Sequence, residues 1–269
     1  MILRELLNLV EAKYPKFLAE SWDNVGLMIG DYDHNVHRIL VALEANEAVI
    51  EEAIDKKVDL IITHHPFFFS KFNQINSDTL KGRLTLRLIQ NGIALYSMHT
   101  NYDIAFDGMN DQFMKRMGWH ADEIFLPAKT EDWYMEQNSG KIPGLGRITT
   151  LTSEITLAGL CQYMKEQLDM KQIRVVGDTS TNIRKVAVIT GAAADYFEAA
   201  KSAGADVLIS GDMKYHIAQD ALDSGMVVID CGHFETENIF KDAMKDFLTS
   251  VCSLDIISST VNLNPFQYV

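Results

Sequence analysis

Cysteine is scarce in this sequence. The 269 residues include only three cysteines, Cys161, Cys231 and Cys252, which are widely spaced and form no CxxC pair. Secreted domains held together by disulfides carry an even number of cysteines at short spacings. The sequence therefore predicts free thiols and a cytoplasmic protein.

Basic side chains are outnumbered by acidic ones. The chain has 24 lysines and arginines against 37 aspartates and glutamates, which gives a formal net charge of −13. A chain this acidic repels the phosphate backbone, whose binding depends on lysine and arginine contacts. General nucleic-acid binding is therefore not expected, although a local basic pocket for a small ligand is compatible with any net charge.

Long apolar runs are also missing. No segment approaches the ~18 consecutive apolar residues that a membrane-spanning helix needs. Residues 1–20 mix charged and apolar side chains, and Ile2, Leu6, Leu9 and Val10 recur at helical spacing. This pattern predicts an amphipathic helix rather than a signal peptide, and we expect no membrane association.

Three common catalytic motifs are absent. The sequence contains no GxxxxGK[ST], GxGxxG or GxSxG, so the motifs of P-loop kinases, dinucleotide enzymes and serine hydrolases are lacking. The composition is that of an ordinary folded protein, with 47% hydrophobic and 23% charged residues. The length is sufficient for two lobes, each with its own core.

Strand-like and helix-like segments alternate along the chain. In the first half, strands are predicted at residues 26–30, 38–44, 59–65 and 93–103, and helices at 47–58 and 77–92. In the second half, strands are predicted at 185–191, 206–212 and 226–233, and helices at 195–204 and 215–225. We expect Ser77 or Asp78 to cap one helix and Gly92 to end it. Such alternation favours parallel sheets covered by helices.

Two segments of the first half recur 147 positions later. The run that begins at Arg38 matches the run at Lys185, and the run at Asp59 matches the run at Asp206. A chance likeness is the alternative, because any two strand–helix series look alike. The shared offset favours a duplicated α/β unit. We expect a first lobe over residues 1–125 and a second over 126–269, with the C-terminal segment free to pack back on the first.

Histidines gather after the predicted strands, where open α/β sheets bind their ligands. Five of the eight histidines directly follow such strands: His64, His65, His99, His216 and His233. Imidazoles with carboxylates suit Zn, Mn, Fe, Co or Ni, and a bridging carboxylate suits two ions about 3.5–4 Å apart. The pattern predicts a metal site, although a single histidine at a strand end is ordinarily a surface or hydrogen-bonded group.

Two adjacent histidines pose a geometric problem, because neighbouring side chains of a strand point to opposite faces. His64 and His65 reach one site only if the strand ends there and the backbone turns. Pro66 favours an end to pairing, since it keeps His65 extended and cannot donate a ladder hydrogen bond. The three phenylalanines that follow, Phe67–Phe69, are interpreted as packing that shields the site or as an interface.

Other candidates each have an ordinary structural alternative. His233 and Glu237 share one face if a helix begins at His233, but a carboxylate is also favoured near a helix N-terminus by the dipole. Asp103 is either a ligand or a cap or turn residue. On spacing alone, Trp22 is interpreted as a core residue and Asp23–Asn24 as a turn.

Five segments together resemble one known family. They are "SWDNVGLMIGD", "THHPFFF", "HTNYD", "GDMKYHIAQDA" and "CGHFETE", which span residues 21–237. In this order they resemble the GTP cyclohydrolase 1 type 2 homologues, also called Nif three-like dinuclear-metal proteins. The resemblance implies two similar α/β lobes with a dinuclear metal site in the cleft between them. It also implies a toroidal homohexamer and two divalent metal ions per subunit, with zinc among the candidates.

The resemblance also assigns roles to residues. His65 and Asp103 would hold one ion, His64 and His233 the other, and Glu237 would bridge them. Three further groups would lie near the centre, with the two histidines as the candidate catalytic acid or base: His99, His216 and Asp212. The sequence departs from many relatives at Glu44, where they carry aspartate, and has no room for the middle domain that some members insert.

Three functions are compatible with such a centre. The first is a metal-dependent hydrolase of a nucleotide or related heterocycle, in which water opens the imidazole ring of a purine such as that of GTP. The second is a metal-dependent phosphoesterase. The third is a non-catalytic metal-binding hexamer that serves as a scaffold or regulatory protein.

Overall fold

The computed structural model describes residues 1–70 and 73–267. Contacts between residues divide the chain into two compact units. Unit 1 contains Met1–Tyr102 and Phe240–Pro265, and unit 2 contains Asp103–Ile239 and residues 266–267. The lobes 1–125 and 126–269, with a C-terminal segment free to pack back on the first, stay a prediction.

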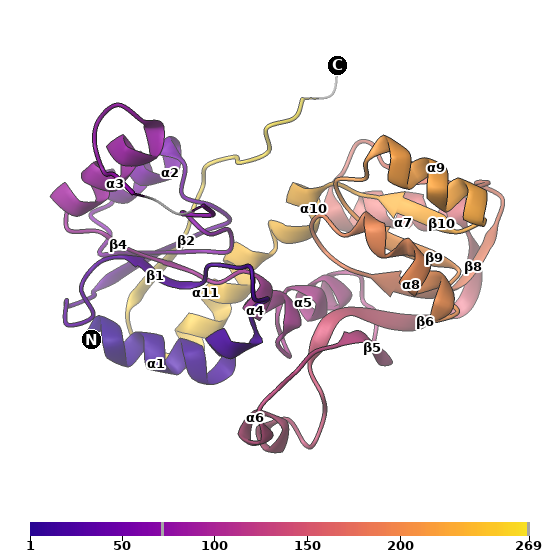
Figure 1. Ribbon diagram of the computed structural model, residues 1–269, viewed down its shortest axis with the longest axis horizontal. Helices are drawn as coiled ribbons and strands as arrows, with labels where there is room; N and C mark the ends of the chain where they lie inside the picture. The colour runs from indigo at the N-terminus through magenta and orange to yellow at the C-terminus, as the bar shows by residue number, and fades with distance from the viewer. Residues whose placement is uncertain (71–72, 268–269) are drawn as a thin grey trace. The chain divides into compact units, whose positions relative to one another are not determined.

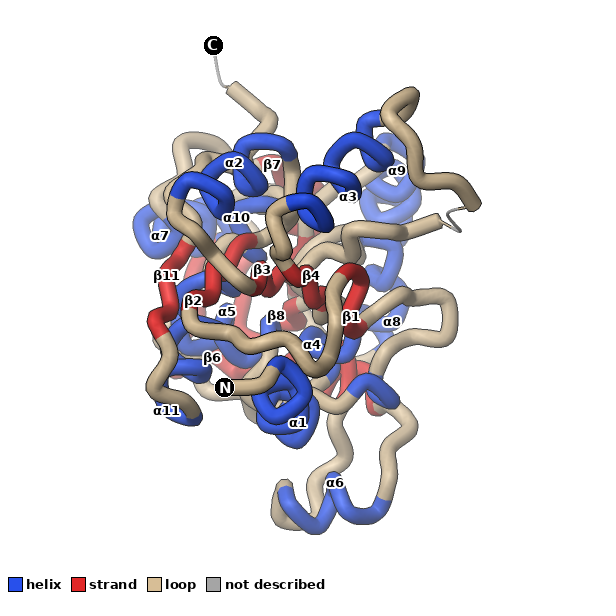
Figure 2. The backbone as a smooth tube through the Cα atoms, turned by 90° about the vertical axis from the view of Figure 1, so that its left-hand side faces the viewer, coloured by secondary structure: helices blue, strands red, loops and turns tan. Residues whose placement is uncertain are grey.

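Unit 1 is built on a five-stranded sheet with the order β1-β4-β3-β2-β11, which can be followed across the sheet in Figure 2. Its strands are β1 (Gly26–Ile29), β2 (Arg38–Ala42), β3 (Leu60–Thr63), β4 (Ala94–Ser97) and β11 (Asp255–Ser258). The last four are mutually parallel, whereas β1 pairs antiparallel with β4. All four residues of β3 are buried, as expected for a central strand covered on both faces.

Helices cover both faces of this sheet. Those of unit 1 are α1 (Leu3–Lys13), η1 (Lys16–Leu18), α2 (Glu47–Asp55), α3 (Leu80–Gln90) and α11 (Phe240–Val251). Helices α2 and α3 lie on one side, and α1 and α11 lie on the other (Figure 1). The cap of α3 corrects the prediction of Ser77 or Asp78: Thr79 Oγ1 accepts the amide of Gly82 at 3.0 Å, because the helix begins at Leu80.

Unit 2 carries a six-stranded sheet with the order β5-β6-β8-β9-β10-β7. Its strands are β5 (Glu123–Pro127), β6 (Gly144–Thr156), β7 (Arg174–Val176), β8 (Asn182–Val188), β9 (Val207–Ser210) and β10 (Val227–Asp230). The central trio β8-β9-β10 is parallel, and β7 pairs antiparallel with β10. The helices are α5 (Met109–Arg116), α6 (Asp132–Gln137), α7 (Leu157–Leu168), η2 (Ala194–Tyr196), α8 (Phe197–Ser202), α9 (Tyr215–Ser224) and α10 (His233–Glu237), and the short α4 (Thr100–Ile104) runs from unit 1 into unit 2.

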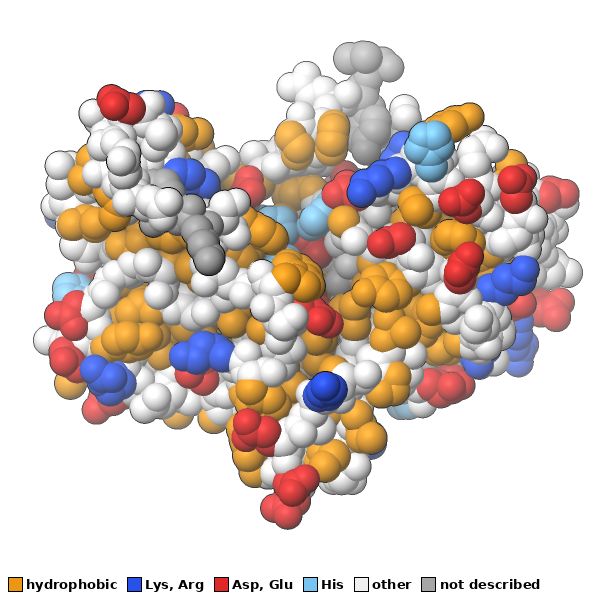
Figure 3. Space-filling view, in the orientation of Figure 1, with side chains coloured by type: hydrophobic (Ala, Val, Ile, Leu, Met, Phe, Trp, Pro, Cys, Tyr) orange, Lys and Arg blue, Asp and Glu red, His pale blue; other side chains and the backbone are white. Residues whose placement is uncertain are grey.

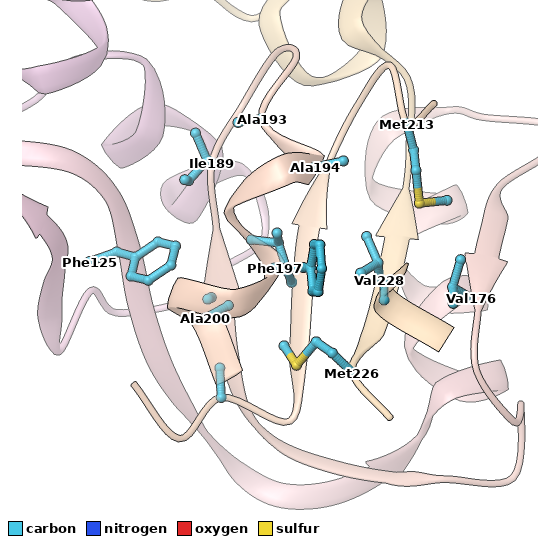
Figure 4. Close-up of a cluster of buried hydrophobic side chains, with 14 of the residues drawn as sticks. Phe125, Val176, Ile189, Ala193, Ala194, Phe197, Ala200, Met213, Met226 and Val228 are labelled. Atoms are coloured by element: carbon cyan, nitrogen blue, oxygen red, sulfur yellow. The ribbon is translucent and has the colours of Figure 1, made fainter. Parts of the chain in front are cut away.

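In unit 2, successive side chains of the central strands point to opposite faces of the sheet and pack into two separate cores. Along β9, Leu208 joins the core under α8 and α9, whereas Val207 and Ile209 join the core under α5 and α7. Figure 4 shows the first of these cores, with Phe197 of α8 lying over the sheet. This two-sided burial is why the strands appear in the sequence as nearly continuous apolar runs.

The two units repeat one plan. In each, three parallel strands are flanked by an antiparallel strand that precedes them in the chain, β1 beside β4 and β7 beside β10. Asp59 Oδ2 accepts hydrogen bonds from the amide of Arg38 and of the residue before it, at 2.9 and 2.7 Å. Asp206 Oδ2 makes the same pair with Lys185 and its predecessor, at 2.7 and 2.8 Å. The predicted duplicated α/β fold is confirmed.

A pair of glycines extends the repeat. Gly30 and Gly177, again 147 positions apart, both have a positive φ, of +130° and +117°. A Cβ on Gly30 would lie 2.7 Å from the Cβ of Ala94, and a Cβ on Gly177 would lie 3.0 Å from Val227. Each glycine therefore lets the end of the edge strand, β1 or β7, lie close to the strand beside it, β4 or β10.

The surface agrees with the acidic composition. Lysine and arginine side chains are scattered among acidic ones over the face shown in Figure 3. Among residues 1–70 and 73–267, no helix is both long enough and apolar enough to cross a membrane.

Candidate metal centre

The end of β3 places two histidines on a turning backbone. The amides of His64 and His65 both donate to the carbonyl of Leu43, at 3.1 and 2.9 Å, and Thr63 Oγ1 donates to the carbonyl of His65 at 2.9 Å. Because two successive amides share one acceptor, regular strand pairing stops here. The imidazole rings lie 5.2 Å apart and 42° from parallel. Adjacent histidines thus occupy one region, as the position before Pro66 predicts.

His64 is held in a definite orientation. It is fully buried, and its Nδ1 lies 3.0 Å from the carbonyl oxygen of Met98. That oxygen is an acceptor only, so Nδ1 carries the proton and Nε2 carries the lone pair. A neutral imidazole with this arrangement is the usual metal-ligating form.

His99 joins the two histidines of β3 in unit 1. Its ring centroid lies 5.2 Å from that of His64 and 5.9 Å from that of His65. Its Nδ1 lies 3.0 Å from Asp23 Oδ1, and Asp23 Oδ2 accepts two further hydrogen bonds from Thr100. Burial alone would raise the pKa of the Asp23 carboxyl, but His99 and Thr100 outweigh it and lower the pKa to about 2.

The role of Asp23 was missed by sequence reasoning, which interpreted it as a turn residue. Its side chain is 0% exposed and fixes the imidazole that the resemblance names as a catalytic candidate. The interpretation of Trp22 as a core residue is wrong, because its side chain is 60% exposed and lies beside His99. The spacing of apolar residues around Trp22 does not show whether its side chain is buried or exposed.

The phenylalanine run divides into buried and exposed members. Phe67 is 2% exposed and belongs to the core of unit 1, as the packing interpretation states. Phe69 is 60% exposed, and its ring lies 5.6 Å from that of His99.

In unit 2, His233 has a carboxylate at each ring nitrogen. The predicted helix does begin after Gly232, so Glu237 lies one turn beyond His233, with Oε2 2.9 Å from Nε2. On the other side Asp212 Oδ2 lies 2.8 Å from Nδ1. Burial alone would lower the pKa of His233, but Glu237 and Asp212 outweigh it and raise the pKa to about 10.

Glycines make room for these groups. Gly191, at the end of β8, has a φ of +71°, and a Cβ there would lie 2.2 Å from Glu237 Oε1. Its amide donates to Thr236 Oγ1 at 3.0 Å, which ties the turn to α10. Gly191 thus lies against the candidate ligand Glu237, whereas the sequence pattern predicted it only as the last residue of the strand 185–191.

Asp103 is linked to the same turn through one buried amide. It lies in α4 and is 8% exposed. Its carbonyl accepts a hydrogen bond from Asn110 Nδ2 at 3.0 Å, and Asn110 Oδ1 accepts the amide of Thr190 at 3.1 Å. Asn110 therefore fixes the backbone of Asp103 relative to the end of β8 within unit 2, a role with no sequence signal.

His216, the second predicted catalytic residue, is differently placed. It is exposed in the first turn of α9, where its ring contacts Tyr215. The hydrogen bonds and ion pairs of the described residues include none to His216. The structure thus sets His99, but not His216, in a polar network.

The chain offers suitable metal ligands in both units. Five side chains belong to groups of His, Asp and Glu residues that could hold a metal ion: His64, His65, His99, Asp103 and Glu237. The donor chemistry fits, because nitrogen and carboxylate oxygen ligands together suit divalent transition ions.

Comparison with known proteins identifies the family of the chain. Residues 1–265 match the family model described as Duf34/NIF3 (NGG1p interacting factor 3). The chain is 37% identical over 275 aligned positions to a Clostridium perfringens protein named GTP cyclohydrolase 1 type 2 homolog, and the alignment covers all of both chains. It is 40% identical over 235 positions to a Clostridium acetobutylicum protein of the same name, covering 87% of this chain and 85% of that one.

A solved structure shares the fold over the whole length. A Bacillus cereus protein related to NIF3 is 27% identical and superposes with a TM-score of 0.92, covering 100% of this chain and 99% of the other. The ligand pattern, the fold and the family match lead to one conclusion. The chain belongs to the Duf34/NIF3 family, as its five motifs predict.

Proposed function

We propose that the protein binds two divalent metal ions through His64, His65, Asp103, His233 and Glu237. One observation carries the proposal. With Nδ1 of His233 donating to Asp212, the lone pair of Nε2 faces the carboxylate of Glu237 at 2.9 Å. Two acceptors at this distance need a shared cation, and a carboxylate behind the imidazole is typical of metal-ligating histidines.

We further propose that the protein is a hydrolase of a nucleotide or related heterocycle. The names of its relatives support this reaction class. When bound, divalent ions polarise a substrate oxygen and lower the pKa of water. His99 would move the proton, because Asp23 holds its Nδ1 and so leaves Nε2 to act as the acceptor.

Metal content tests the first proposal. Protein purified without added metal, and protein reloaded with Zn, Mn, Fe, Co or Ni, would be analysed for metal per chain. We expect two ions in the wild type and a clear loss in His65→Ala and Glu237→Gln. The exposed His120 and Glu198 supply matched controls, His120→Ala and Glu198→Gln, which should retain both ions. Wild-type metal content in both ligand variants would show that the proposed ligands are wrong.

Product analysis tests the second proposal. The reloaded protein would be incubated with GTP and with generic phosphoesters, and products followed by mass. Formate or a formamidopyrimidine is the expected result. Free phosphate would instead identify a phosphoesterase. Tight metal binding with no turnover would favour a metal-binding scaffold. A His99→Ala variant that keeps its metal but loses turnover would support the proton-transfer role.

A further inference from the structure

We propose that Trp22 and Phe69 form a stacking platform that binds a planar nitrogen heterocycle, such as a purine base, beside His99. The inference deepens the proposed function, on which it rests for the reaction that follows binding. Both rings are 60% exposed, whereas Phe67 of the same run is 2% exposed. Two large aromatic side chains therefore face solvent next to the partly exposed imidazole of His99, which is held by the buried carboxylate of Asp23.

The ring geometry favours a flat ligand. The planes of Trp22 and Phe69 lie 22° from parallel, with centroids 6.3 Å apart. Each stands 76° from the plane of His99, at centroid distances of 6.0 and 5.6 Å. The three centroids thus form a nearly equilateral triangle, in which the two exposed rings are roughly parallel to each other.

Hydrogen bonds fix the segment that carries Trp22. Asp23, the next residue, is anchored by Thr100 and His99 with its side chain 0% exposed. Asn24 Nδ2 donates to the carbonyl of Phe68 at 2.7 Å. That bond joins the segments bearing the two platform rings. A platform held in place in this way spends little conformational entropy on ligand binding.

Charge and polarity complete the recognition. Stacking on an aromatic ring is available to any base, because every base has a π-face. Since Asp23 occupies Nδ1 of His99, Nε2 is the ring nitrogen that can bond a polar edge of the ligand. The net charge of −13 gives no general attraction for phosphate, and the contribution of the platform itself is to bind the heterocycle.

Tryptophan fluorescence tests the platform directly. The chain has three tryptophans, so a background with Trp119→Phe and Trp133→Phe leaves Trp22 as the reporter. We expect saturable quenching by guanosine 5′-monophosphate and none by ribose 5-phosphate, which lacks the base. Phe69→Ala should raise Kd roughly 5- to 100-fold. Phe69→Tyr should restore binding, and the control Tyr32→Ala, which removes an exposed aromatic elsewhere in unit 1, should leave Kd unchanged.

Three results would overturn the inference. They are equal binding of ribose 5-phosphate and the nucleotide, an unchanged Kd in Phe69→Ala, or tighter binding of choline, which would identify a cation cage. Metal content measured on the same sample separates the two proposals. Normal metal without base binding refutes the platform alone, whereas base binding without metal refutes the metal-binding proposal alone.

Discussion

At the scale of single residues, each unit contains an imidazole near the candidate centre whose Nδ1 is hydrogen-bonded to a carboxylate. Asp23 holds His99 in unit 1, and Asp212 holds His233 in unit 2. In both, the carboxylate binds Nδ1 and leaves Nε2 for a ligand or a proton. The strand-end pattern predicted the imidazoles but not Asp23, because a carboxylate 76 residues away along the chain has no periodic relation to its partner.

Replacing Asp23 tests its electrostatic contribution. The pKa of Asp23 is lowered from 3.8 to about 2 in the folded protein. Ionised Asp23 therefore stabilises the fold above pH 4, and this stabilisation is lost as the pH falls through 2. Asp23→Asn should therefore lower the free energy of unfolding at pH 7 by about 2 kcal/mol. Urea denaturation with a chelator present, at pH 7 and at pH 3, should show the deficit shrinking at the lower pH. A deficit independent of pH would contradict this assignment.

Gly191 is the residue where one added methyl group should act on the site. The Cβ of Gly191→Ala would lie 2.2 Å from Glu237 Oε1, and the positive φ adds strain. We expect the Glu237 carboxylate to move and the metal content to fall well below wild type. Gly204→Ala is the matched control, since that glycine also has a positive φ but no neighbouring atom within 4 Å of the added Cβ. Equal metal content in the two variants would contradict the expectation.

At the scale of elements, strands were the most predictable feature. Apolar runs located β2, β3 and β4 in unit 1 and β8, β9 and β10 in unit 2, because burial on two faces leaves little room for polar residues. Strand β11 and helix α11 were not predicted. The short run Asp255–Ser258 becomes a strand only through pairing with β2, which lies far away in sequence. Likewise, the N-cap of α3 was predicted at Ser77 or Asp78, whereas it is Thr79. Serine, aspartate and threonine are all good capping residues, so the sequence did not distinguish among them.

The paired aspartates before β3 and β9 should stabilise their units alike. Asp59 and Asp206 each accept two backbone amides through one carboxylate oxygen. Asp59→Asn and Asp206→Asn should each lower the free energy of unfolding by about 1.5–3 kcal/mol, the range for hydrogen bonds to a charged group. Asp55→Asn, at an exposed position, should change it little. Denaturant titration of the three variants makes the comparison, and a loss in only one of the pair would show that the repeated bonds are not equivalent.

At the scale of the whole molecule, the duplication was readable from a single offset. Sequence repeats locate equivalent strands, yet they do not reveal which unit a later segment joins. Phe240–Pro265 belongs to unit 1, although it follows Asp103–Ile239 of unit 2 in the chain. The sequence left the C-terminal segment free to pack back on the first lobe, and long-range pairing of β11 with β2 is what joins it to unit 1.

The resemblance also predicts a homohexamer, which light scattering can test. The expected particle contains six copies of the 30.3 kDa chain. A mass equal to that of one chain would remove the hexamer prediction without affecting the metal ligands. Cytoplasmic location stays a prediction that cell fractionation would test.

The split composition of unit 1 has a consequence for biosynthesis. Strand β2 is made early, but its neighbour β11 follows about two hundred residues later, as the Arg38–Asp255 contact across 217 positions shows. The sheet of unit 2 is formed by one continuous stretch of chain, from β5 to β10, and can be completed before synthesis of the chain has ended. The sheet of unit 1 remains incomplete, with one edge of β2 unpaired, until the segment that contains β11 has been synthesised. The N-terminal half is thus synthesised first and finished last.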